Sequence, residues 1–426
     1  MKRAGAKYAE IITFLILLLE ILALILNVNG IHNSGLLIDA GQKIIHKENP
    51  FIPMQPYGTS PSILFWLIDK FSFSGFNNVN FILINLCGLY LCIKFIFTDY
   101  PKMMHLQILT LVLITSPTRA LVGNVQHTGI IYFFIFLAYS LQTKTRSAKN
   151  NVIPFILCRF VIVFSLVMAI EIKWQIAIPF IICWIFKERD FALGFSVIGL
   201  LILLRAFIDL WVGRILELDQ LEVWKVQRLD HQAIIEQVSF WKVITRITSS
   251  EIDWFQISFI LYLLLILANI YFVFQNGSRN SLVFAIFIPT SIAYLHLYDL
   301  VIISILAGFL CMRFITTRGV VFSISLLILP TKFSNSSEIV KGVVLLFAIL
   351  LILFFNRKVF SFLLLAGILL ESAFAAILVI LISSLNFDLE YKVSLQLTLV
   401  FAILAVLISK IIIDSRDSNK VGRYGK

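Results

Sequence analysis

Apolar runs of about 20 residues recur along the chain, and they restrict its fold more than any other feature. Examples are residues 8–28, 256–275 and 359–383. At about 1.5 Å per helical residue, each run is long enough to cross a hydrocarbon layer about 30 Å thick. The runs are continuous rather than alternating, which predicts helices and argues against a membrane β-barrel. Only 14% of the residues are charged, against about 25% in soluble domains. The sequence therefore predicts an all-α, polytopic transmembrane helical bundle.

The basic residues lie mostly in the short loops between these runs. Clusters occur at 144–149, at 357–358 and in the tail 410–426. Such loops face the cytoplasm in membrane proteins, so both termini are predicted to be cytoplasmic. Counting runs between the basic loops gives about 11–14 spans, although residues 319–331 are too few to cross alone. The net charge of +11 is therefore interpreted as a topology signal, and no nucleic-acid partner is expected.

Two regions can be distinguished along the chain. Residues 1–316 form a predicted transmembrane catalytic module that includes two long outer loops, 29–79 and 213–255. Residues 317–426 supply further apolar helices and a basic cytoplasmic tail. The five cysteines lie in apolar runs without metal-site spacing, which favours core packing. No metal site and no cofactor are predicted.

Within the first outer loop, a stretch with helical apolar spacing at 34–45 carries one acid, Asp39. Such a stretch is typical of a helix lying along the membrane surface. Asp39 is either a solvated loop acid or a general base at the lipid–water interface, where it would take a proton from an attacking hydroxyl. Asn49-Pro50 ends this stretch, and Tyr57 lies in the Pro-rich turn that follows.

Polar residues also mark the outer end of the next apolar helices. Gln126 and His127 open an apolar run, with Arg119 shortly before them. The amide and imidazole groups are candidates for binding sugar hydroxyls, and Arg119 is a candidate for binding an anion. The alternative is ordinary capping of a helix at the membrane surface.

Two turns on the same predicted side contain charged groups. Glu171 and Lys173 divide two apolar stretches, so Lys173 is a candidate phosphate contact or one half of a local Glu–Lys pair. A second turn between apolar runs concentrates imidazole, phenol and carboxyl groups, which suit phosphate or sugar contacts or an aromatic belt. Its candidate residues are His296, Tyr298 and Asp299.

The loop 213–255 contains an amphipathic segment at 234–246 with aromatic and aliphatic residues on one side. It is predicted to be a second interfacial helix. Either it covers a lipid-substrate groove, with Arg246 near phosphate, or it is a structural belt helix.

These segments, in this order, resemble the integral-membrane GT-C glycosyltransferases, and most closely the polyprenyl-phosphate-mannose-dependent α-mannosyltransferases of glycosyltransferase family 87. The family acid usually falls several residues before the alanine, in the slot filled here by Asn33. The segments that carry the resemblance are Asp39-Ala40, Lys47 to Phe51, Pro56-Tyr57, Ser60-Pro61, Gly123 to Gln126, Lys173 to Gln175, Glu236 to Arg246 and His296 to Asp299.

The resemblance implies an inverting, metal-independent hexosyltransferase of the cell envelope, with its active site on the outer face of a bacterial plasma membrane. The donor would be a polyprenyl-phosphate sugar such as mannose, and the acceptor lipid- or glycan-linked. It assigns Asp39 as the base. The implied substrate-binding residues are Tyr57, Gln126 and His127 for sugar, Lys173, Arg246 and His296 for phosphate, and Arg119, Tyr298 and Asp299 around them.

Two other classes of protein fit the same features in part. An O-antigen or capsule polymerase is also polytopic with a long outer loop. A lipid-linked sugar transporter or flippase would place charges within its spans. Most ionisable residues here lie at the ends of the predicted spans, and the exceptions are Glu20, Arg159, Arg205 and Glu371.

Overall fold

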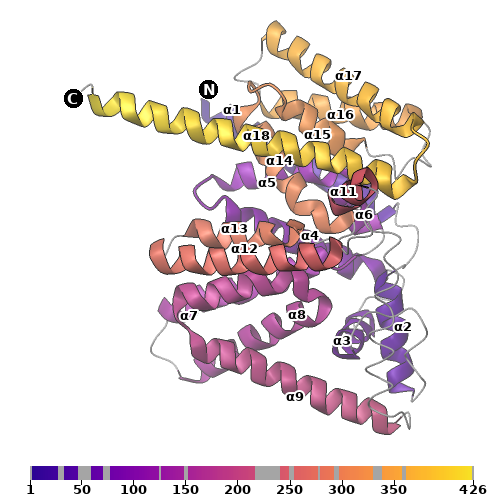
Figure 1. The fold of residues 1–426 in the computed structure, drawn as a ribbon, viewed down its shortest axis with the longest axis vertical. Helices are drawn as coiled ribbons and strands as arrows, with labels where there is room; N and C mark the ends of the chain where they lie inside the picture. Colours follow the sequence, from indigo (N-terminus) through magenta and orange to yellow (C-terminus); the bar gives the residue numbers. More distant parts are fainter. Residues whose placement is uncertain are drawn as a thin grey trace.

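In the computed structural model, the described part of the chain consists of helices joined by short turns, without a β-strand (Figure 1). The described residues are 2–26, 33–46, 59–70, 77–123, 126–147, 152–215, 240–248, 254–276, 279–291, 297–329, 338–356 and 361–424. The helices that position the polar clusters are α1 (Lys2–Leu26), α2 (Asn33–Ile45), α3 (Thr59–Lys70), α4 (Asn77–Ile96), α5 (Lys102–Leu113), α6 (Ser116–Gly123), α7 (Thr128–Ser147), α8 (Val152–Glu188) and α9 (Phe191–Ile215). The later elements are α11 (Phe240–Thr248), α12 (Trp254–Asn276), α13 (Arg279–Phe287), η3 (Ile288–Ser291), η4 (Leu297–Leu300), α14 (Val301–Phe314), α15 (Val320–Ile328), α16 (Glu338–Phe355), α17 (Phe362–Ser384) and α18 (Leu389–Tyr424).

Five helices in the described part of the chain are long and apolar enough to cross a membrane. Several shorter helices, among them α5 and α14, are equally apolar. For the described residues, the prediction of an all-helical fold with helices able to span a membrane is therefore confirmed. The five candidate spans are Val79–Ile96, Phe155–Glu188, Gln256–Gln275, Phe362–Ser384 and Leu389–Lys410.

Helix α8 folds back on itself at Lys173, as the polar interruption predicted. Lys173 has non-helical backbone angles, φ −160° and ψ 88°. Arg159 near the start of α8 forms an ion pair with Asp190 just after its end, 31 residues later. In a straight helix these residues would lie about 46 Å apart. The two arms of α8 are therefore antiparallel, with Lys173 at the apex and Arg159 and Asp190 at the base.

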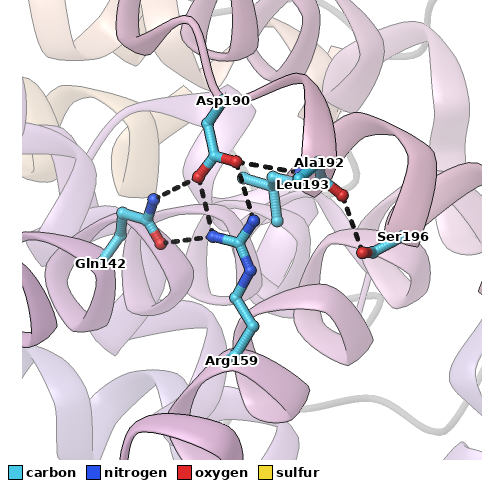
Figure 2. Close-up of polar contacts among 6 residues, drawn as sticks. All are labelled: Gln142, Arg159, Asp190, Ala192, Leu193 and Ser196. Atoms are coloured by element: carbon cyan, nitrogen blue, oxygen red, sulfur yellow. Dashed lines mark hydrogen bonds and ion pairs between the residues drawn. The ribbon is translucent and has the colours of Figure 1, made fainter.

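The base of this hairpin is held by one carboxylate (Figure 2). Arg159 donates two hydrogen bonds to Asp190, each 2.8 Å long. Gln142 of α7 donates to the same carboxylate at 2.8 Å and accepts from Arg159 at 3.2 Å. The other oxygen of Asp190 accepts the backbone N–H of Leu193 at 3.0 Å, which caps the first turn of α9. A single side chain thus joins α7, both ends of α8 and α9.

We expect Asp190→Asn to reduce the acid sensitivity of folding. The hydrogen bonds from Arg159 lower the pKa of Asp190 to about 2. Burial acts in the opposite direction and raises this pKa, whereas the hydrogen bonds from Leu193 and Gln142 lower it further. Because the pKa is lower in the folded chain, the ionised carboxylate stabilises the fold at pH values above its ordinary pKa of 3.8. This stabilisation is lost as the pH falls towards 2. After allowance for solvent screening, the contribution of ionised Asp190 to the free energy of unfolding is on the order of 1 kcal/mol. Thermal unfolding in detergent between pH 7 and pH 2 measures it, with the exposed Asp99→Asn as control. Equal acid sensitivity in wild type and Asp190→Asn would contradict this assignment.

Helices α4 and α7 touch through their backbones. A Cβ added to Gly88 would lie 1.8 Å from the carbonyl oxygen of Gly129, and one added to Gly129 would lie 2.5 Å from Oδ1 of Asn85. Neither contact is sterically possible, so the helices must separate to accept any side chain.

Gly88→Ala is accordingly expected to lower the free energy of unfolding by about 3 kcal/mol, the upper end of the usual cost of overpacking. Gly367→Ala in α17 is the matched control, because nothing lies within 4 Å of its added Cβ. That control should change stability by no more than about 1 kcal/mol. Melting temperatures of the two purified variants provide the comparison, and equal values would mean that the helices separate freely.

The nine-residue helix α15 has side-chain partners from other helices at both ends. At its start, Glu371 of α17 accepts the backbone N–H groups of Gly319 at 2.8 Å and Phe322 at 2.9 Å. At its end, the carbonyl of Ile328 accepts Arg119 of α6 at 2.7 Å. An acid therefore faces the positive end of the helix dipole and a base faces the negative end. These contacts explain how a segment too short to span the membrane is kept inside the bundle.

Candidate functional site

A buried ion pair lies at the apex of the α8 hairpin. The Nζ of Lys173 donates to Oδ2 of Asp299, which η4 brings to the apex from 126 residues further along the chain. The side chains are 13% and 0% exposed, respectively. The hydroxyl of Thr128, the first residue of α7, donates to Oδ1 of Asp299 at 2.7 Å. Both carboxylate oxygens therefore have donors, and the charge of Lys173 has a buried counter-charge.

His127 completes what we call the apex cluster: His127, Thr128, Lys173 and Asp299. The imidazole is buried and interacts electrostatically with both Lys173 and Asp299. Its other neighbour is the ring of Phe65 of α3, edge-on at a centroid distance of 4.9 Å. Helices α3, α7 and α8 and the short helix η4 therefore converge on one buried polar cluster.

Glu171 and Lys173 each have an ion-pair partner on another helix. Glu171 is 1% exposed and accepts Nε of Arg205 in α9 at 2.7 Å, while Lys173 contacts Asp299. Close to the apex, the hydroxyl of Tyr262 in α12 donates to the carbonyl of Gln175 at 2.8 Å. The apex is thus fixed by three separate parts of the chain.

Asp39 lies on α2, outside the apex cluster. Its side chain is 53% exposed and pairs with Lys43 one turn later at 2.9 Å. Helix α2 packs very closely on α3, since a Cβ added to Gly41 would lie 2.3 Å from the carbonyl oxygen of Ser62. Phe65 on α3 in turn contacts His127. The helix that carries Asp39 is thereby attached to the cluster through α3, and its carboxylate is exposed.

Arg119 and Arg246, both candidates for binding phosphate or another anion, have partners within the described residues. The Nη2 of Arg119 donates to the hydroxyl of Ser116 at 3.2 Å and to the carbonyl of Ile328. Arg246 lies over the ring of Phe387 at 5.6 Å, in the turn between α17 and α18. Arg119 therefore caps a helix, and Arg246 fastens α11 to the C-terminal helices.

Helix α11 (Phe240–Thr248) agrees with the second half of the amphipathic segment predicted at 234–246, whose first residues, 234–239, lie outside the described part of the chain. It is fastened by two further contacts, from Trp241 to the carbonyl of Ser291 at 2.7 Å and from Lys242 to Asp388 at 3.4 Å. Phe240 and Ile247 are 48% and 71% exposed. They give α11 an apolar face that suits the membrane surface.

The remaining candidates can be placed only in part. Gln126 is buried beside His127. Tyr57 and His296 lie outside the described residues, and Tyr298 is described in its backbone alone. Thr128 and Phe65 were not predicted. The position of a hydroxyl residue at the start of an apolar helix was a usable signal for Thr128, whereas Phe65 resembles any other core aromatic in the sequence.

Three of the four charges that would suit a transporter have partners on other elements. Arg159 pairs with Asp190, Arg205 with Glu171, and Glu371 caps α15. Glu20 of α1 is buried, and neither of its carboxylate oxygens accepts a hydrogen bond within the described part of the chain.

Within the described residues, no group of three His, Cys, Asp or Glu side chains lies close enough to hold a metal ion. Comparison of the chain with protein-family models, with curated proteins and with solved structures gives no match.

Proposed function

We propose that the chain is an inverting glycosyltransferase of GT-C type, embedded in a bacterial plasma membrane. It moves a hexose, such as mannose, from a polyprenyl-phosphate donor to a lipid- or glycan-linked acceptor on the outer face. The proposal includes the predicted topology of about 11–14 spans with both termini in the cytoplasm. Residues 1–316 would form the catalytic module, and residues 317–426 the supporting helices and basic tail.

The observation that carries the proposal is the apex cluster, a buried cation at one end of a membrane hairpin. Lys173 is held by Asp299, which is held in turn by Thr128. The phosphodiester of a polyprenyl-phosphate sugar that reached this point from the membrane would find an ammonium group already in position, and the phosphate monoester released by transfer would keep that contact. Preorganised charge of this kind stabilises the negative charge that builds on a leaving group.

In the proposed reaction, Asp39 takes the proton from an acceptor hydroxyl. The hydroxyl oxygen forms a bond to the anomeric carbon as the bond to the phosphate oxygen breaks, which inverts the configuration. The electron pair leaves with the polyprenyl phosphate, where Lys173 balances its charge. The exposed position of Asp39 on α2 suits a base that must meet an acceptor arriving from outside. Gln126 and His127 would contact the sugar. Tyr57 and His296, which lie outside the described residues, are assigned to the proposed site from the sequence.

A transfer assay on the purified full-length chain in lipid nanodiscs tests the proposal. The donor is polyprenyl phosphate carrying radiolabelled mannose or glucose, and membrane lipid extract supplies the acceptor. Label should move to a new lipid or glycan product with the opposite anomeric configuration, and no label should move from a nucleotide sugar. Movement of intact labelled donor across a liposome membrane, without any new product, would instead identify a transporter. Lengthening of a lipid-linked oligosaccharide would identify a polymerase.

A further inference from the structure

A groove runs between α3 and α4 next to the apex cluster. Its volume is about 430 Å³, within the range of small-molecule sites. Five aliphatic side chains and one amide line it: Leu64, Leu67, Ile68, Asn80, Leu83 and Ile84.

The two helices present equivalent sets of residues to the groove. On each, the lining residues follow the spacing i, i+3, i+4, which places them on one face of a helix. The residue after the first of each set is Phe65 on α3 and Phe81 on α4. Each phenylalanine is rotated by about 100° from that first residue, and both are fully buried, with stacked rings 5.2 Å apart. The aromatic pair therefore forms the inner boundary, and the aliphatic set forms the groove.

The walls of the groove are partly exposed at the surface of the bundle. Helix α4 contains the candidate span Val79–Ile96. Leu67 and Leu83, on opposite walls of the groove, are 39% and 44% exposed. Without a charged lining residue, such a groove suits a hydrocarbon chain and gives no partner to a polar molecule. The one polar lining group is the amide of Asn80.

The groove is connected to the apex cluster through Phe65, the residue next to Leu64 in the lining. Phe65 stacks on Phe81 and also contacts His127. His127 interacts electrostatically with Lys173 and Asp299. One aromatic pair thus separates the groove from the buried charges.

We propose that this groove binds the hydrocarbon chain of the lipid-linked substrate. The proposal rests on the proposed function and gives the substrate's apolar part a site of its own. A chain bound between α3 and α4 leaves its phosphate end near the apex cluster. The groove is short compared with a polyprenyl chain, so it selects the units next to the phosphate, and the rest of the chain stays in the bilayer.

Photo-crosslinking of the full-length chain in nanodiscs tests this site. The probe is polyprenyl phosphate with a diazirine in a unit close to the phosphate, and labelled peptides are identified by mass spectrometry. Labelling should concentrate on residues 62–70 and 79–88. Leu83→Trp, which fills the groove, should reduce that labelling about tenfold, the equivalent of losing the burial of about two methylene groups. Leu263→Trp in α12, at a site 43% exposed, is the matched control and should leave labelling unchanged.

Three outcomes would overturn the groove assignment. They are equal labelling of α3, α4 and α12, unchanged labelling in Leu83→Trp, and equal groove labelling by a diazirine phosphatidylglycerol, which would indicate an ordinary lipid contact. The result is separable from the proposed function. If wild type is labelled specifically in the groove but transfers no sugar, the groove binds the lipid and the proposed glycosyltransferase activity is wrong. If wild type transfers sugar without labelling of the groove, the activity is supported and the groove assignment is wrong.

Discussion

Replacing Asp39 by asparagine is expected to lower sugar transfer by about 10²–10⁴-fold, the usual contribution of a general base. Asparagine keeps the size and polarity of the side chain and removes only its ability to accept a proton. The fold should tolerate the change, because Asp39 is 53% exposed and its pairing with Lys43 is a surface contact. Such a contact contributes less than about 1 kcal/mol. Initial rates with radiolabelled donor, normalised to folded protein, measure the effect.

Two variants complete that experiment. Lys43→Met removes the partner of Asp39 and should leave most of the rate, since the base itself remains. Asn33→Ala tests the position where the resembling family usually has its acid, and it too should leave most of the rate. Full transfer by Asp39→Asn would remove Asp39 from the mechanism, and Asp299 would then be the next carboxylate to test.

Lys173→Met is expected to have the second large effect, on both stability and rate. It leaves Asp299 as a fully buried charge without its cation, which costs about 3–5 kcal/mol. It also removes the charge proposed to stabilise the leaving phosphate, with an expected loss in rate of about 10²–10³-fold. Chemical denaturation and initial rates should be measured on the same preparations.

The double variant Lys173→Met/Asp299→Asn separates the two roles of Lys173. It removes both charges, so most of the lost stability should return, because replacing a whole buried pair costs little. The rate should stay low, since the ammonium group is still absent. If the double variant recovers wild-type transfer, Lys173 is only a structural partner of Asp299. Asp299→Asn alone should destabilise the chain by leaving Lys173 without its counter-charge.

The sequence predicted the turn at Lys173 but not the residue that meets it there. Apolar runs on both sides of Glu171 and Lys173 were sufficient to predict a fold-back, because a charged pair rarely lies in the middle of a span. Asp299 was a candidate for a different reason, its position in an outer turn. Its pairing with Lys173 depends on packing between segments 126 residues apart, which no local pattern encodes.

The same limit applies to the other charges. Arg205 and Glu371 stood out as charges within apolar runs, a pattern equally typical of a transporter. Their partners, Glu171 and the start of α15, became visible only in three dimensions. For Asp39 the helical spacing at 34–45 was sufficient to predict helix α2. The spacing did not reveal that Gly41 brings α2 into backbone contact with α3.

Helix α15 has a consequence for how the chain is made. With nine residues and both ends dependent on other helices, it has no favourable position in lipid on its own. Its N-terminal partner, Glu371, is synthesised about 50 residues after Gly319. During synthesis, the first N–H groups of α15 therefore lack this partner until α17 has been made. The stable position of α15 is then expected to follow the synthesis of α17, when the carboxylate of Glu371 meets the N–H groups of Gly319 and Phe322.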